Sequence, residues 1–274
     1  MFCNRNLSFA LPTCVAISKR ILRRSLFAVL LLASVAATAF AQPSPPDSRR
    51  PVLVELFTSE GCSDCPPADA LLARLDATQF VPGARAIVLS EYVTYWDHQG
   101  WRDPFSLEEM TSRQEQYVHR FGLDSSYTPQ MVVDGVSQLV GNNAQALNHA
   151  VASAAQEPKK LLTIEDAQLN RDTVQFSVRG GVDTDARLIA VLAENTTHSE
   201  VARGENAGRT LHHVAVVRVM KEFGSDAVDG RKLSLAAKGV SHEGDAKDPI
   251  RLVVFQVDHR SGRVLSAAEQ TLSR

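Results

Sequence analysis

The hydrophobic residues in the first half of the chain form two kinds of pattern. Nearly continuous apolar, β-prone runs at 52–57 (VLVELF) and 86–89 (AIVL) are typical of strands that are buried on both faces. Apolar residues at helical spacing predict one helix that begins at Pro66 and a more polar helix over 107–121. The first half is therefore predicted to alternate strands and helices, as α/β domains do.

A hairpin and a third helix are predicted after the polar helix. The runs 130–133 and 136–140 are joined by an Asp-Gly pair at 134–135, which is typical of a tight hairpin turn. Asn142 or Asn143 can then cap a helix. From the first strand onward, the predicted order is strand, helix, strand, helix, strand, strand, helix.

The pattern changes after residue 158 to short runs in which apolar and polar residues alternate. Seven such runs predict strands at 161–164, 174–178, 188–192, 213–219, 233–236, 252–257 and 264–267. The segment 258–262 predicts a hairpin loop between the last two strands. Because no convincing helix interrupts them, the second half is predicted to be an all-β sandwich of roughly 110 residues.

The first 41 residues have the three parts of an export signal. Basic residues at 19–24 precede an apolar run at 26–37, and the sequence Ala-Phe-Ala at 39–41 forms a cleavage site. The apolar run has about a dozen residues, whereas a membrane-spanning helix needs roughly 20. We expect export to a periplasm or to the outside medium and no stable membrane span after cleavage; a permanent anchor is the alternative. The Pro-rich segment 42–50 is expected to be a disordered leader.

Cleavage of the signal changes both the charge and the cysteine content. The signal contains five Lys and Arg residues and no acid, so 24 basic residues remain against 31 acidic ones and the formal net charge becomes −7. Such a surface, without a basic tract, argues against a nucleic-acid partner and against attraction to anionic lipid. Cys3 and Cys14 leave with the signal, so only Cys62 and Cys65 remain in an oxidising compartment.

The sequence Cys62-Ser63-Asp64-Cys65 lies between a predicted buried strand and the start of a helix. A helix N-terminus favours a thiolate by up to about 2 kcal/mol, which can bring the pKa of a thiol from about 8.5 towards about 7. The carboxylate of Asp64 opposes this effect. We therefore expect a modest thiolate at Cys62, and we expect its sulfur to be exposed to partners.

Other interpretations of the cysteine pair remain open at this point. A disulfide that closes so short a loop adds only about 2 kcal/mol of stability, against about 3 kcal/mol for a 15-residue loop, so the spacing favours a redox role over a structural staple. A metal site needs more ligands, and His98, His119 or Met131 are candidates for copper. Since no spacing selects these three residues, we expect no metal and no cofactor.

Four segments of the sequence resemble one known family. They are 54–69, 95–97 with 100–105, 127–135 and 203–213. Together they closely resemble the secreted, thioredoxin-like family catalogued as domain of unknown function 1223. The resemblance implies a thioredoxin-like α/β domain at 51–157, with a helical insertion at about 92–125, followed by an all-β, sandwich-like domain at 158–274. It implies no particular reaction.

The wider thioredoxin superfamily implies roles for the matching residues. By that resemblance Cys62 would be the attacking thiolate and Cys65 the resolving thiol. Pro129 would be a cis-proline whose loop, together with Thr128, presents backbone to a substrate chain. Thioredoxins also keep a buried carboxylate that moves the proton of the resolving cysteine, and Glu55 resembles it, although it lies one position out of register.

Glu55 has a second interpretation that does not involve the cysteines. An ionised carboxylate in a strand that is buried on both faces is unfavourable by several kcal/mol unless it is paired or protonated. Glu55 can satisfy this requirement by pairing with a basic side chain such as Arg102 or Arg209. In that case its role is structural.

Two tryptophans lie between the second strand and the polar helix. Trp96 and Trp101 either pack a long insertion against the domain or line a groove for substrate beside Cys62. The polar segment 203–210 is predicted to be an interdomain or hairpin loop, with Glu205 paired to Arg209, and not to take part in catalysis.

These features predict an exported thiol-disulfide oxidoreductase-like protein that acts on a protein or on a small thiol or disulfide. Cys62 and Cys65 would carry out the exchange beside Pro129. The alternative is a non-enzymatic module that binds a ligand or partner and uses the disulfide as a staple. A copper-binding chaperone is a further alternative.

Overall fold

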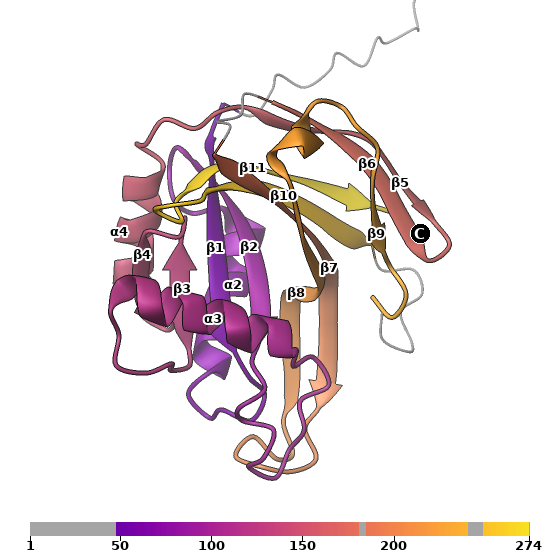
Figure 1. Ribbon diagram of the computed structural model, residues 1–274. Coiled ribbons are helices and arrows are strands. Elements are labelled where there is room, and N and C mark those ends of the chain that lie inside the picture. The colour runs from indigo at the N-terminus through magenta and orange to yellow at the C-terminus, as the bar shows by residue number, and fades with distance from the viewer. Residues whose placement is uncertain (1–47, 181–184, 241–248, 274) are drawn as a thin grey trace, which may run out of the picture. The chain divides into compact units, whose positions relative to one another are not determined.

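The first half of the chain forms the predicted succession of strands and helices. The computed structural model in Figure 1 describes residues 48–180, 185–240 and 249–273. The first seven elements are β1 (Arg50–Thr58), α2 (Pro66–Thr78), β2 (Ala84–Tyr92), α3 (Glu108–Phe121), β3 (Gln130–Val133), β4 (Ser137–Val140) and α4 (Ala144–Ala154). The predicted signal peptide at 1–41 and most of the leader at 42–50 lie outside the described residues. No helix of the described part is long and apolar enough to cross a membrane.

The seven strands predicted in the second half are also present. The elements are β5 (Leu162–Asn170), β6 (Thr173–Gly180), β7 (Ala186–Glu200), β8 (Thr210–Phe223), the 3-10 helix η1 (Ser225–Val228), β9 (Leu233–Ala236), β10 (Ile250–Asp258) and β11 (Val264–Leu272). Both predicted hairpins form as well. Asp134 and Gly135 connect β3 to β4 with φ values of 50° and 68°, and the segment 258–262 connects β10 to β11.

The predicted fold class, a thioredoxin-like α/β domain followed by an all-β sandwich, is wrong. The structure is mostly β and contains one eight-stranded mixed sheet in the order β11-β10-β7-β8-β2-β1-β3-β4. Strand β8 lies parallel to β2, and the Ser90 hydroxyl donates a hydrogen bond to the carbonyl oxygen of Val214 at 2.8 Å. Four strands of the second half therefore extend the sheet of the first half, while β5, β6 and β9 form a smaller sheet. The predicted domain boundary at 157–158 stays a prediction.

Strands β7 and β10 explain why the two halves share a sheet. Their apolar runs at 188–193 and 252–257 are buried on both faces. One face, with Leu192, packs against the small β5-β6-β9 sheet, and the other face packs in one core with Leu53 of β1 and Ile87 of β2. A strand with two buried faces belongs in the middle of a covered sheet, whereas sandwich strands have one solvated face.

Strand β1 brings the cysteines to one edge of the large sheet. Strands β1 and β2 are parallel and β3 runs antiparallel to β1, so the ends of β1 and β2 and the start of β3 meet at the lower edge in Figure 1. The loop 59–65 leaves the sheet there. Successive β1 side chains point to opposite faces: Val54 and Leu56 pack with helices α2 and α4, whereas Glu55 contacts helix α3 on the other face.

Candidate active site

The cysteine pair is a disulfide at the start of helix α2. Cys62 and Cys65 are bonded to each other, and Cys65 is the capping residue that precedes the first helical residue, Pro66. The amide of Asp69 donates a hydrogen bond to the carbonyl oxygen of Cys65 at 3.1 Å, and the amide of Cys65 donates to the carbonyl oxygen of Cys62 at 3.2 Å. Cys62 thus lies in the turn before the helix, and Cys65 is at the helix end itself.

The expectation of an exposed Cys62 is wrong for this disulfide form. Cys62 is 1% exposed and Cys65 is fully buried, whereas Ser63 and Asp64 between them are exposed. A loop from the second half of the chain, residues 201–209, connects β7 to β8 and is hydrogen-bonded to the backbone around the disulfide. We call it the cover loop.

Hydrogen bonds join the cover loop to residues 59–65, which we call the cysteine loop. The side-chain amide of Asn206 donates to the carbonyl oxygens of Glu60 at 2.8 Å and Cys62 at 2.9 Å. The carboxylate of Glu205 accepts a hydrogen bond from the amide of Ser63 at 2.9 Å, and hydrogen bonds from the Ser63 side chain and amide lower the pKa of Glu205. The predicted pairing of Glu205 with Arg209 is replaced by these contacts.

Pro129 lies beside the first turn of helix α2. The Thr128–Pro129 peptide bond is cis, as predicted, and Pro129 immediately precedes strand β3. The amide of Gly141 donates to the Pro129 carbonyl oxygen at 2.9 Å. A Cβ atom added to Gly141 would lie 3.0 Å from Pro129 and 3.1 Å from Ala68 in the first turn of α2. The predicted proline and the helix that Cys65 caps are therefore neighbours.

Both tryptophans anchor the segment after β2 to the cysteine loop. The Trp96 indole donates to the hydroxyl of Thr128 at 2.8 Å, and a Cβ atom at Gly61 would lie 3.0 Å from the Trp96 Cβ. The Trp101 indole donates to the carboxylate of Glu60 at 2.8 Å. The structure thus brings all three predicted substrate-binding residues to the site, and their contact with substrate stays a prediction.

A buried polar network below the cysteine loop was not predicted. The carboxylate of Glu60 contacts the His213 ring at 2.9 Å and also bonds the hydroxyl of Ser199, while the other ring nitrogen of His213 contacts the Tyr92 hydroxyl at 2.6 Å. Burial alone would raise the pKa of Glu60, but the hydrogen bonds from His213, Ser199 and Trp101 outweigh it and lower the pKa. Glu60 therefore joins the cysteine loop to strands β7 and β8.

Two further carboxyl groups beside this network have raised pKa values. Burial raises the pKa of Asp69 to about 6, although His213 and a hydrogen bond from Thr58 act against it. Burial and the nearby Glu60 charge raise the pKa of Asp103 to about 7. The carboxylate of Asp103 accepts a hydrogen bond from the Glu60 amide at 2.7 Å. The site thus contains acids that titrate close to neutral pH.

Asp69 is expected to make the protein less stable as the pH rises from 4 to 6. Its pKa is above the ordinary value, so the folded state binds a proton that the unfolded state has lost in this window, and stability falls with rising pH. A shift of about two units corresponds to up to about 3 kcal/mol. In urea titrations at several pH values, Asp69→Asn should reduce this fall, whereas Asp64→Asn, an exposed control, should leave it in place. An unchanged pH dependence in Asp69→Asn would contradict the prediction.

Glu55 lies on the opposite face of the sheet from helix α2. Its carboxylate accepts hydrogen bonds from Arg113 Nε and from the Tyr117 hydroxyl, both at 2.6 Å. Glu91 lies next to it, 3.6 Å from Arg113 Nε, and burial together with repulsion from Glu55 raises the pKa of Glu91 well above its usual range. The basic partner is Arg113, and not Arg102 or Arg209. The structure does not bring Glu55 together with the cysteines, and its predicted proton-transfer role is not supported by any contact.

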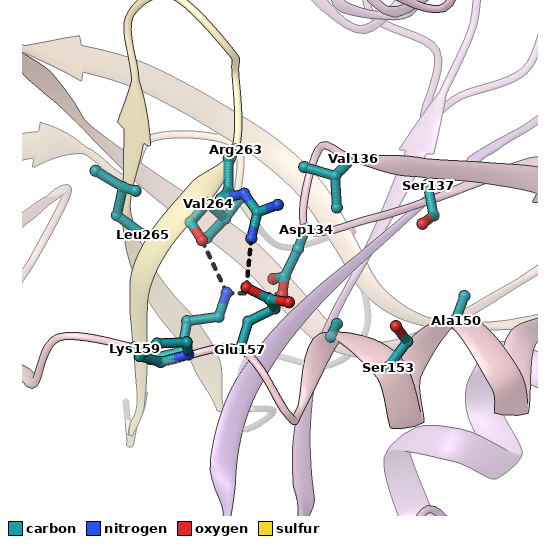
Figure 2. A pocket seen from close by; sticks show the side chains of 12 residues that line it. Asp134, Val136, Ser137, Ala150, Ser153, Glu157, Lys159, Arg263, Val264 and Leu265 are labelled. Atoms are coloured by element: carbon teal, nitrogen blue, oxygen red, sulfur yellow. Dashed lines mark hydrogen bonds and ion pairs between the residues drawn. The ribbon is translucent and has the colours of Figure 1, made fainter.

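A small cavity of about 100 Å³ lies elsewhere, between the β3–β4 turn, the end of α4 and strand β11 (Figure 2). Lys159 enters it and donates hydrogen bonds to the carboxylate of Asp134 at 2.7 Å and to the carbonyl oxygen of Val264 at 2.8 Å. Arg263 and Glu157 form a second ion pair at its rim. Both cations are thus neutralised by protein carboxylates, and none of the predicted site residues lines this cavity.

The candidate copper ligands have different surroundings. Met131 is fully buried in strand β3, whereas His98 and His119 are exposed. Within residues 48–180, 185–240 and 249–273, no group of three or more His, Cys, Asp or Glu side chains is arranged to hold a metal ion.

Comparison with known proteins places the chain in a family and supports its fold. A crystal structure of protein AGR_C_4864 from Agrobacterium tumefaciens is similar, with a TM-score of 0.59 and 22% sequence identity, over 80% of this chain and 92% of that chain. At this identity the likeness supports the fold alone. No curated protein matches the chain significantly. The model of a family described as "Protein of unknown function (DUF1223)" matches residues 53–255. The chain therefore belongs to the DUF1223 family.

Proposed function

We propose that the protein is a thiol-disulfide exchange protein in which Cys62 and Cys65 are the reacting groups. The observation that carries the proposal is the disulfide between two cysteines three positions apart at the start of helix α2. So short a loop gains little stability from a cross-link. A helix N-terminus stabilises a thiolate, so the position suits a bond that is made and broken.

The exchange proceeds in two displacements. In the reduced protein, the Cys62 thiolate attacks one sulfur of a partner disulfide, forms a mixed disulfide and releases the first partner thiolate. The Cys65 thiolate then attacks the Cys62 sulfur, restores the intramolecular bond and releases the second partner thiolate. The partner gains two electrons and the two protons of the cysteine thiols, and the protein pair is oxidised. The same steps in reverse oxidise a partner dithiol.

The local arrangement supports a relationship to the thioredoxin superfamily at this site. Strand β1, the cysteine pair, helix α2, strand β2 and later a proline directly before strand β3 follow in the order that the superfamily uses, and Pro129 lies beside the helix that Cys65 caps. We propose this relationship for the site and not for the whole fold. Pro129 and Thr128 would shape the edge to which a protein or small thiol or disulfide docks.

The proposed compartment is the periplasm or the outside medium. The predicted signal at 1–41 supports export, and the two cysteines that remain after cleavage are bonded to each other. Oxidising compartments allow such a bond to form and persist. The cytosol, in contrast, keeps most protein thiols reduced.

The burial of both sulfur atoms favours a second candidate function. With Cys62 1% exposed and Cys65 fully buried, the disulfide could staple the loop of a module that binds a partner without any exchange. The two functions differ in the stability of the disulfide towards reductants.

A redox equilibrium with glutathione separates the two functions. For an exchange protein we expect a potential between about −300 and −120 mV, the range of known thiol-disulfide oxidoreductases. The fraction of oxidised protein is measured by alkylation and mass spectrometry over a series of glutathione ratios. A potential well below about −300 mV, with no thiol of the native protein open to alkylation, would favour the staple.

A further inference from the structure

Between its two ends the cover loop, residues 201–209, has one buried polar residue among exposed ones, while Val201 at its start is also buried. Asn206 is 1% exposed, whereas residues 202–205 and 207–210 are all exposed. A polar side chain that is buried alone in a surface loop needs partners for its amide group. The partners of Asn206 are the residues around the disulfide.

We propose that Asn206 is a positioning residue that holds the cysteine loop and closes it to solvent, so that exchange requires the cover loop to lift. This inference rests on the exchange function proposed above. It assigns to a loop of the second half of the chain the control of access to Cys62.

All the hydrogen-bonding groups of the Asn206 side chain are used. Its two amide hydrogens serve the carbonyl oxygens of Glu60 and Cys62, at 2.8 and 2.9 Å. Its oxygen accepts a hydrogen bond from Arg209 at 2.7 Å. Because Arg209 can only donate, it fixes the orientation in which the amide nitrogen faces the cysteine loop. A side chain so constrained holds the backbone on both sides of Gly61 in one conformation.

The cover loop is a separate unit that can lift without unfolding its neighbours. Its ends are joined by hydrogen bonds from the Val201 amide to the Arg209 carbonyl at 3.0 Å and from the Gly208 amide to the Val201 carbonyl at 2.7 Å. These bonds stay intact when the loop moves as a whole. The bonds that must break include the two from Asn206 and those between Glu205 and Ser63.

Lifting also requires little loss of buried surface. Most residues of the cover loop are already exposed, and its packing includes Gly204, whose added Cβ would lie 3.2 Å from the Trp101 Cβ. The barrier to opening therefore depends mainly on a few hydrogen bonds, each of modest net strength. These hydrogen bonds form a clamp that is strong enough to hold the cover loop on the cysteine loop and weak enough to break when the cover loop lifts.

The test is the rate at which a small dithiol reduces the disulfide of the native protein. Asn206→Ala removes both bonds from Asn206 to the cysteine loop, and we expect reduction by dithiothreitol to become about tenfold faster, which corresponds to about 1.4 kcal/mol. Arg203→Ala, a change at an exposed residue of the same loop, is the matched control and should react at the wild-type rate. The rate of reduction by dithiothreitol and the rate of the reverse reaction, reoxidation of the cysteine pair, should rise by similar factors, because a closed cover loop slows both. The equilibrium constant should therefore change much less than either rate.

Asn206→Asp provides a second variant if Asn206→Ala folds poorly. It keeps the size of the side chain and an oxygen for Arg209, but it removes both donors to the cysteine loop, so it should also react faster than wild type. Rates equal to wild type in both variants would overturn the proposed clamp. The glutathione equilibrium of the wild-type protein is measured separately, so failure of the exchange function is distinguished from failure of the clamp.

Discussion

Replacement of Arg113 by methionine is expected to lower the free energy of unfolding by about 3–5 kcal/mol, because it leaves the buried carboxylate of Glu55 without its cation. Glu55 and Glu91 have no exposed side-chain surface, and the Arg113 side chain is 12% exposed. Arg113 also donates to the Tyr117 hydroxyl at 3.1 Å. Methionine keeps much of the apolar volume of the arginine stem, so the change tests mainly the charge.

Urea denaturation of the two proteins measures this effect, and its pH dependence gives a second readout. The loss should become smaller as the pH falls, because protonation neutralises carboxylates that have no cation. The control is Arg85→Met, which breaks a partly exposed pair with Glu269 at 3.2 Å and should change stability by about 1 kcal/mol or less. A loss below about 1 kcal/mol in Arg113→Met would show that the buried pair is not held by this arginine.

The elements of the fold could be predicted from the sequence, but their assembly could not. The runs at 52–57 and 86–89 are continuous and apolar, and they form the buried strands β1 and β2 as predicted. The runs at 188–193 and 252–257 are also continuous and apolar. Such runs indicate strands in the middle of a covered sheet. The pairing of β8 with β2 depends on contacts between distant residues, which periodicity does not encode.

The candidate site was predictable where its residues are close in sequence to a recognisable pattern. Cys62 and Cys65 are bonded to each other and Pro129 lies near Ala68 in the first turn of α2, while the catalytic roles of these residues stay predictions. Asn206 and His213 were not predicted as parts of the site, because they lie about 140 to 150 residues beyond the cysteine loop they contact. The polar composition of 203–210 gave one indication, since such a loop often binds another part of the chain.

Glu55 shows the limit of reasoning from resemblance. Its position in a buried strand predicted that it needs a partner, and it has one in Arg113. The face to which it points could not be read from one strand, because the faces are defined only when the helices are placed. The buried acids that lie nearer to the cysteines in sequence are Glu60, in the loop before Cys62, and Asp69, in the first turn of α2.

A variant with Cys65 replaced by serine is expected to accumulate a covalent adduct at Cys62. Without the resolving thiol, a mixed disulfide formed at Cys62 cannot be displaced within the protein, so it persists until a reductant is added. The adduct should form on Cys65→Ser and not on Cys62→Ser. The second variant lacks the attacking sulfur and keeps only Cys65, which is fully buried in the disulfide form. The probe is glutathione disulfide, and the adduct is detected by intact-protein mass spectrometry.

This trapping experiment tests the central claim, the reactivity of the Cys62–Cys65 pair, most directly. The account predicts one glutathione on native Cys65→Ser, removed by dithiothreitol, and none on native Cys62→Ser. It would be contradicted if neither native variant is modified while both are modified in urea, or if Cys65 reacts and Cys62 does not.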